Sequence, residues 1–320
     1  MRARTDPTFS EFLLRVGNGD EPTIRDNLIL LPEQLTVKHS RDGFPEEPII
    51  QEIFPNMQEN AATAKYVTER AILASRNDHV NKLNDKLIAM FPGESKIFNS
   101  FDSAEDDTNN YYQEEYLNTL TPNGLPPHRL ELKENAPIML LRNLDPSNGL
   151  CNGTRMICRG FSQNVLQAEI SSGHSATNHV FLPRIQLSPP ENEGYPFKFI
   201  RKQFPVRLCF AMTINKAQGQ TIQNVGLYLP QHVFSHGQLY VALSRGISMS
   251  TTKVLVLTEQ PKHQNGTYTK NIVYKEVLGT ITPYTYMAIL ARIINYLQIM
   301  HTNNITLLQI SGLEDTPMQT

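Results

Sequence analysis

The spacing of apolar and polar positions changes several times along the chain, and each change marks a predicted element. Near the start, apolar residues recur at the three- and four-residue spacing of a helix: Phe9, Phe12, Leu13 and Val16. They predict a helix over residues 7–17, which the run Gly17–Gly19 ends. Four more elements follow: a short strand at 28–31, a short helix at 47–54, a core strand at 70–74, and a helix at 77–90 that turns Val80, Leu83, Leu87 and Ile88 inward. A buried strand that leads into an amphipathic helix is typical of α/β proteins.

The next stretch, from Lys96 to about Leu125, is polar and acidic. Its carboxylates are Asp102, Glu105, Asp106, Asp107, Glu114 and Glu115. Because charged side chains are rarely buried without a partner, we expect this connection to form a solvated surface.

From His128 to about Arg201, the pattern changes to short strands separated by turns rich in Gly, Asn, Ser and Pro. The predicted strands are 128–133, 138–142, 154–161, 165–171 and 180–187. This rhythm is typical of a small antiparallel barrel. The α/β pattern resumes at Arg207, so the barrel is predicted as an insert in an interrupted α/β domain.

The segment 204–258 reads as two strand–turn–helix units. Alternating apolar residues predict a strand over 206–212, and a donor-rich turn follows at 213–221. A second strand at 225–229 leads to a helix at 236–244. Open α/β sheets bind their ligands at strand ends of this kind.

Charge is distributed unevenly along a chain whose formal net charge is −2. Nothing acidic lies between Glu193 and Glu259, whereas that interval carries Lys198, Arg201, Lys202, Arg207, Lys216, Arg245 and Lys253. A one-signed cationic segment is what a phosphate-binding surface needs. Two simpler interpretations stay open: Arg245 as a partner of a helix end, and Lys216 as a solvated side chain.

Composition narrows the class of protein. An apolar content of 40% and a charged content of 19% are those of a soluble globular protein. No apolar run reaches the roughly 18 residues that span a bilayer, so no membrane partner is expected. Cys151, Cys158 and Cys209 suit a reducing compartment. No His lies at ligand spacing from Cys151 and Cys158, so we expect no metal site.

Several segments resemble motifs of the Pif-type DNA helicases (petite integration frequency family, superfamily 1B), including the versions carried by plant Helitron-like elements. AMTINKAQGQT at 211–221 resembles motif V, and QLYVALSR at 238–245 resembles motif VI. AILASRNDHVNKLN at 71–84 looks like motif IV. Three segments are similar to the family's small inserted 2B domain, and one to the helix after motif III: 125–133, 137–144 and 149–155, and 6–19. The resemblance covers about residues 1–260.

The resemblance implies an α/β fold. It would be a second RecA-like domain, a parallel sheet flanked by helices, interrupted by the antiparallel β-barrel of the 2B insert. Four parts are expected: the first part of the RecA-like domain at 1–124, the 2B insert at 125–200, the second part at 201–278, and a tail of unknown role at 279–320. In the tail, Tyr286 to Met300 carry a helical apolar stripe and 303–312 suits a strand.

Two elements of such a motor are not found in the sequence. No Gly-Lys dipeptide occurs, so there is no P-loop, and Asp20-Glu21 stands in a turn rather than at a strand end. In the resembled family both elements precede the part that matches here. We therefore expect the C-terminal half of a helicase, which does not hydrolyse ATP alone. ATP and Mg²⁺ are expected only together with the missing N-terminal RecA-like domain, and none is expected on this chain alone.

The family mechanism implies roles for individual residues. Arg245 would be the arginine finger that reaches the γ-phosphate of ATP. Arg76 is a candidate second phosphate contact, with a surface arginine at a helix start as the alternative. The coupling and DNA-contacting residues would be Gln218, Gly219 and Gln220, which link the nucleotide cleft to DNA, and Thr213, Asn215 and Lys216, which bind single-strand phosphates. At His128 and Arg129 a role in strand-edge solubility is favoured over DNA contact.

The function that the resemblance implies is part of an ATP-dependent 5′–3′ DNA helicase. Its expected roles lie in DNA repair, recombination, replication or telomere maintenance, in the nucleus. Its expected partners are single-stranded DNA and the missing first RecA-like domain. Two alternatives stay open: a non-catalytic module that binds single-stranded DNA, and a transposon-derived relic.

Overall fold

The computed structural model describes residues 3 and 5–276, except 26, 40–42, 106, 108–110, 172, 174, 191–193 and 263. Residues Met1–Val273 form one compact unit and Tyr274–Thr320 a second. The helices and strands given below all belong to the first unit. The helix and strand predicted in the tail lie outside the described residues.

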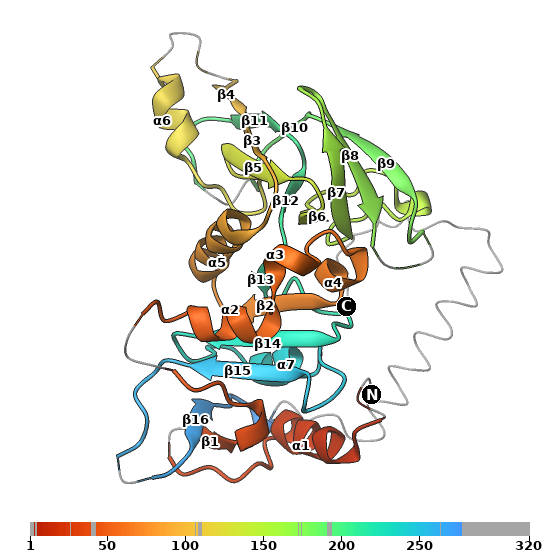
Figure 1. The fold of residues 1–320 in the computed structure, drawn as a ribbon. Helices are drawn as coiled ribbons and strands as arrows, with labels where there is room; N and C mark the ends of the chain where they lie inside the picture. The colour runs from red at the N-terminus through yellow and green to blue at the C-terminus, as the bar shows by residue number, and fades with distance from the viewer. Residues whose placement is uncertain are drawn as a thin grey trace, which may run out of the picture. The chain divides into compact units, whose positions relative to one another are not determined.

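A four-stranded parallel sheet forms the centre of the first unit (Figure 1). Its strands follow the order β13 (Ala211–Thr213), β2 (Arg70–Ala74), β14 (Asn224–Leu229) and β15 (Thr252–Val256), and each neighbouring pair is parallel. The strands predicted at 70–74 and 225–229 are therefore confirmed. All four strands are short and apolar, as expected for a sheet covered on both faces.

Helices cover the two faces of this sheet, and alternate strand residues enter different cores. Ile72 and Ala74 belong to the apolar cluster of α2 (Glu47–Ile53) and α5 (Asn77–Met90). Ala71 and Leu73 belong to the cluster of α1 (Pro7–Asn18) and α7 (Gln238–Leu243).

The helix predicted at 7–17 is confirmed, and its ends explain its bounds. Asp6 caps α1 by accepting a 3.0 Å hydrogen bond from the Phe9 N–H, and Gly19 ends it in the left-handed conformation. The predicted inward residues of α1 and α5 are buried. Other short elements near the parallel sheet are β1 (Leu28–Leu31), η1 (Glu33–Leu35), α3 (Met57–Asn60), α4 (Ala64–Thr68) and β16 (Thr267–Lys270), with β1 and β16 paired antiparallel.

Apart from the β1–β16 pair, the antiparallel strands lie between β2 and β13 in the sequence and fall into three sheets. The first has the order β12 (Val206–Leu208), β6 (Pro137–Leu140), β7 (Arg155–Phe161), β8 (Val165–Ile170) and β9 (His179–Pro183). The second comprises β10 (Ile185–Leu187), β11 (Phe199–Gln203) and β4 (Phe101–Ala104), and the third pairs β3 (Ser95–Asn99) with β5 (Arg129–Lys133). A 3₁₀ turn, η2 (Pro146–Asn148), follows β6. These pairings do not form one continuous closed barrel, so the predicted barrel is not confirmed. The strand predicted at 180–187 breaks at Arg184, where the chain leaves the first sheet for the second.

The acidic connection from 96 to 125 differs from its prediction. It contains β4, most of β3 and the helix α6 (Glu114–Thr119). The Asp102 side chain is fully buried rather than solvated, because the Nε and Nη2 of Arg201 donate to its carboxylate at 3.0 and 2.6 Å. The partner lies 99 residues away, so local acidity gave no sign of the pairing.

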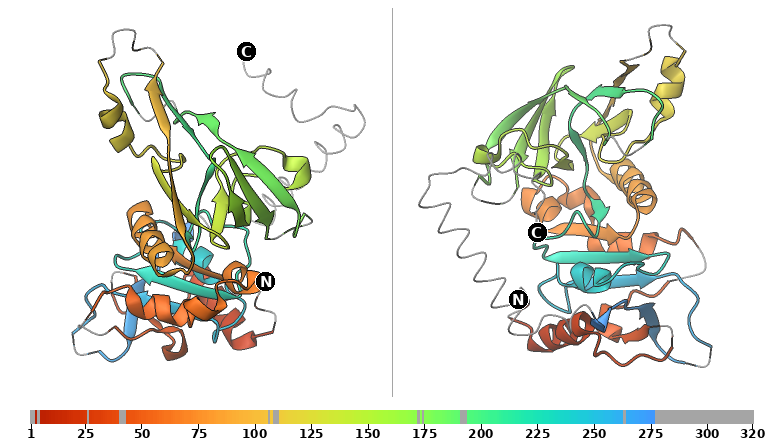
Figure 2. Two further views of the ribbon diagram at one scale, coloured as in Figure 1. Left: turned by 45° about the horizontal axis from the view of Figure 1, so that its top comes forward. Right: turned by 180° about the vertical axis from the view of Figure 1, so that it is seen from behind.

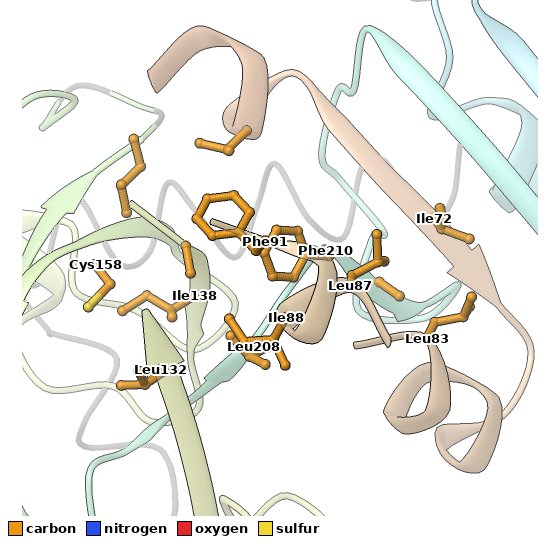
Figure 3. Close-up of a cluster of buried hydrophobic side chains, with 14 of the residues drawn as sticks. Ile72, Leu83, Leu87, Ile88, Phe91, Leu132, Ile138, Cys158, Leu208 and Phe210 are labelled. Atoms are coloured by element: carbon orange, nitrogen blue, oxygen red, sulfur yellow. The ribbon is translucent and has the colours of Figure 1, made fainter. Parts of the chain in front are cut away.

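The strand predicted over 206–212 is also two strands. β12 pairs antiparallel with β6, and β13 pairs parallel with β2. The chain thus passes from the antiparallel sheets into the parallel sheet at Cys209 and Phe210. Phe210 packs beside Phe91 of the segment after α5, in a core that extends to Leu132 and Ile138 (Figure 3).

Two further views show the antiparallel strands on one side of the parallel sheet and α1 with the β1–β16 pair on the other (Figure 2). Within the described ranges, no helix combines the length and the apolar character needed to cross a membrane.

Candidate nucleic-acid interface

Two predicted site segments meet where neighbouring parallel strands end. Thr213 at the end of β13 is the register partner of Ala74 at the end of β2, and the Ile214 N–H donates to the Ala74 carbonyl at 3.0 Å. The residues that follow, Arg76 and the turn at 213–216, therefore lie at one edge of the sheet. This is the edge at which open α/β sheets bind ligands.

A hollow of about 810 Å³ opens at this edge, and we call it the basic hollow. It is lined by Ser75, Arg76, Asn77, Asp78, Asn123, Gly124, Leu141, Arg207, Thr213, Asn215, Lys216 and Phe234. Four sequence-predicted residues are thus brought together: Arg76, Thr213, Asn215 and Lys216. The other four, Gln218, Gly219, Gln220 and Arg245, are not part of its lining.

The basic hollow has a surplus of positive charge. Among the lining residues that the structure describes, Arg76, Arg207 and Lys216 are cationic and Asp78 alone is acidic. The Arg76 guanidinium contacts Asp78 at 3.1 Å, and both side chains are more than half exposed. Although burial acts to raise the pKa of Asp78, the nearby His79 and Arg76 hold it below its usual value. Asp78 thus stays a weak, exposed counter-charge that a stronger anion can displace.

Lys216 shows the effect of this surplus. Burial, followed by the positive charges of Arg207 and Arg142, lowers the pKa of its ammonium. Its Nζ donates to the Asn152 Oδ1 at 3.0 Å, which is a neutral partner. A phosphate placed here would favour the charged ammonium, since an opposite charge offsets both causes.

The sequence did not identify Arg207 and Arg142 as site residues. Arg207 lies on β12, where its Nη2 donates to the Asn81 Oδ1 at 2.6 Å. Arg142 follows β6 and donates to the carbonyls of Gly124 and Ser188, both at 3.2 Å. Arg207 was visible only as one cation of an acid-free interval, and Arg142 comes from the insert, far away in the sequence.

Of the remaining predicted residues in the donor-rich turn, Gln220 contacts the insert. The Gln220 Nε2 donates to the Gly153 carbonyl at 3.3 Å, beside the contact of Lys216 with Asn152. Gly219 adopts φ of 85°, a conformation that favours glycine, and it is exposed together with Gln218. The insert loop at 149–154 therefore sits directly on the turn that carries Lys216.

Arg245 lies outside the basic hollow and hydrogen-bonds to α7 and to the neighbouring turn. Its side chain is buried, and its Nε donates to the Val241 carbonyl at 2.9 Å. Its Nη1 donates to the Gln220 carbonyl at 3.2 Å and its Nη2 to the Ser244 Oγ at 2.8 Å. The structure thus joins Arg245 to the turn at 213–221. Its reach toward a nucleotide stays a prediction.

A metal site has no support from side-chain geometry in the part of the chain that the structure describes. No group of three or more His, Cys, Asp or Glu residues there is placed to hold a metal ion. Cys151, Cys158 and Cys209 are free thiols. That ATP and Mg²⁺ bind only together with a first RecA-like domain stays a prediction.

The sequence comparisons give matches to one kind of protein. Residues 115–161 match the family model described as the 2B domain of DNA helicase Pif1. The chain is 31% identical over 186 residues to the ATP-dependent DNA helicase PIF1 of Homo sapiens. That match covers 57% of this chain and 26% of the relative, so the chain spans about a quarter of that protein.

Solved structures agree on the fold. The Pif1 helicase of Candida albicans has a TM-score of 0.55 at 19% identity, over 88% of this chain and 58% of that one. Pif1 of Bacteroides bound to single-stranded DNA has a TM-score of 0.54 at 20% identity, over 87% of this chain and 53% of that one. The α/β fold with parallel and antiparallel sheets is therefore similar to that of Pif1 helicases.

Proposed function

Since its relatives by sequence and by fold are Pif1-type DNA helicases, we propose that this chain is the second RecA-like domain of an ATP-dependent DNA helicase, with its 2B insert. Single-stranded DNA would bind in the basic hollow. ATP and Mg²⁺ would be bound by a first RecA-like domain outside this chain, with Arg245 as the finger that completes the site. By the same resemblance we expect 5′–3′ movement and action in the nucleus, in repair, recombination, replication or telomere maintenance.

The observation that carries this proposal is the convergence of cations at the strand ends. Arg76, Arg207 and Lys216 come from three separate segments and line one hollow with Thr213 and Asn215. Guanidinium, ammonium, hydroxyl and amide groups are the donors that bind nucleic-acid phosphates. The hollow also has the insert on one side, so a strand bound there would contact both parts of the unit.

Removal of a hollow cation should weaken DNA binding in a salt-dependent way. We expect Lys216→Ala and Arg207→Ala each to lower the affinity for a single-stranded oligonucleotide several-fold at low salt. Competition by the unlabelled oligonucleotide checks that the binding is specific. Each substitution should also reduce the slope of log affinity against log salt by about 0.7, the value for one lost single-strand phosphate contact. Fluorescence anisotropy with a labelled oligothymidylate, repeated at several salt concentrations, measures both quantities.

Lys253→Ala is the matched control. It also removes one ammonium, but Lys253 lies on β15 and contacts Glu52 and the Gln34 carbonyl, away from the hollow. We expect its salt slope to equal that of the unmodified chain. An equal loss in Lys253→Ala would show that only net charge matters, and unchanged slopes in both hollow variants would refute the proposed site.

The lowered pKa of Lys216 predicts a pH dependence of binding. In the free chain, burial and then Arg207 and Arg142 disfavour the charged ammonium, whereas a bound phosphate favours it. Affinity should therefore fall as pH rises from neutrality toward 10.5, the usual lysine value. In Lys216→Arg the charge persists, so the fall should be smaller. The measurement is the affinity for oligodeoxyadenylate at constant ionic strength. Adenine is used because thymine itself loses a proton at alkaline pH. Identical pH profiles for the unmodified chain and Lys216→Arg would contradict the role of Lys216.

A non-catalytic module that binds single-stranded DNA is the second candidate. It is favoured by one observation, namely that the whole basic hollow is built from residues of this chain. The two candidates share the same binding experiment and differ in ATP turnover after a P-loop domain is supplied.

A further inference from the structure

Phe234 is an exposed aromatic residue at the edge of the basic hollow. Its side chain is 62% exposed, and it lines the hollow together with Thr213, Asn215 and Lys216. It lies on the loop between β14 and α7, a segment that carries none of the phosphate-binding candidates. Single exposed apolar residues are common on protein surfaces, so exposure alone assigns no role.

The loop holds Phe234 in this exposed position. The neighbouring Val233 is buried in the core cluster of α7, which anchors the backbone. The Phe234 N–H donates at 3.0 Å to the Oε1 of Gln238, the buried first residue of α7. Gly237 in addition donates its N–H to the Ile272 carbonyl at 2.9 Å. The ring is therefore presented to solvent by a fixed backbone, which is how a preorganised contact is built.

We propose that Phe234 is a stacking platform for one unpaired base of the strand whose phosphates bind in the basic hollow. This inference rests on the proposed function. In a single strand the bases can turn away from the phosphates and stack on an aromatic face, and such stacking tolerates any base. In a duplex the bases are already paired and stacked, so the same ring would favour single-stranded over double-stranded DNA.

The test uses the whole chain and oligothymidylates that carry one 2-aminopurine, placed at each position in turn. Stacking quenches the fluorescence of this base, so the unmodified chain should quench it at one position of the bound strand. Phe234→Leu keeps an apolar side chain but has no aromatic face. It should lose that quenching and about tenfold in affinity, with the salt slope unchanged, because no phosphate contact is lost. Phe234→Tyr, which keeps the ring, should retain both.

An abasic site at the quenched position completes the test. It should weaken binding of the unmodified chain and leave Phe234→Leu unaffected, since no base remains to stack. Equal affinity and equal quenching in Phe234→Leu would overturn the stacking role while leaving the hollow intact. A proposed function that fails is recognised separately, by salt slopes that Lys216→Ala and Arg207→Ala do not change.

Discussion

Replacing Arg201 by methionine should lower the free energy of unfolding by about 3–5 kcal/mol, the usual cost of breaking a buried ion pair. The side chains of Arg201 and Asp102 are both completely buried. Beyond its two-pronged contact with Asp102, the guanidinium donates to the carbonyls of Leu120 and Pro126, both at 3.1 Å. Methionine fills much of the space but leaves the buried carboxylate with only the Ser100 hydroxyl and His128, which is charged only when protonated. Urea unfolding followed by circular dichroism measures the loss.

Lys198→Met is the matched control, because Lys198 immediately precedes the same strand and also pairs with an acidic residue, Glu105. That pair is about half exposed, so its loss should change the free energy of unfolding by no more than about 0.5 kcal/mol. A second variant, Arg201→Met with Asp102→Leu, removes both charges and should recover much of the loss. A loss below about 1 kcal/mol in Arg201→Met would show that the buried pair does not hold β4 and β11 together.

The elements that could be predicted are those determined by local spacing. The helix at 7–17, the strand at 70–74 and the helix at 77–90 each follow from an apolar period within a few turns, and the structure confirms them. What could not be predicted depends on contacts between distant segments. Apolar residues alternate without interruption over 206–212. The chain nevertheless changes sheets at Cys209, because β12 pairs with β6 and β13 pairs with β2.

The residues of the candidate site also divide into those that the sequence could predict and those that it could not. That Arg76 and Lys216 approach each other follows from two parallel strands being neighbours, which the α/β pattern suggests. Arg142 could not be predicted as a site residue, because it belongs to the insert. Only the structure shows the carbonyls it contacts and its effect on the pKa of Lys216. The burial of Arg245 was also not foreseen. Motif resemblance assigns the residue a role but says nothing of the hydrogen bonds that hold it.

The second large effect is expected at Arg245. In a longer protein in which the P-loop domain of a Pif1-type helicase precedes this chain, Arg245→Lys should lower kcat for ATP hydrolysis by about 10³-fold. Lysine keeps the charge but loses the planar fork that stabilises charge on a transferred phosphoryl group. The chain alone should show no turnover above background. Steady-state phosphate release with saturating single-stranded DNA measures both.

Ser244→Ala separates a catalytic role for Arg245 from a structural one. It removes the hydroxyl that accepts from the Arg245 Nη2 but leaves the guanidinium and its bond to the Gln220 carbonyl. If Arg245 acts on the nucleotide, Ser244→Ala should cost much less in kcat than Arg245→Lys, with DNA affinity unchanged in both. If Arg245 serves only to fasten the end of α7 to the turn at 218–222, Arg245→Lys should instead lower stability and DNA affinity together and leave kcat at saturation intact. If the chain alone hydrolysed ATP and Arg245→Ala abolished that turnover, the proposal would be wrong, because the ATP site would then lie within these residues.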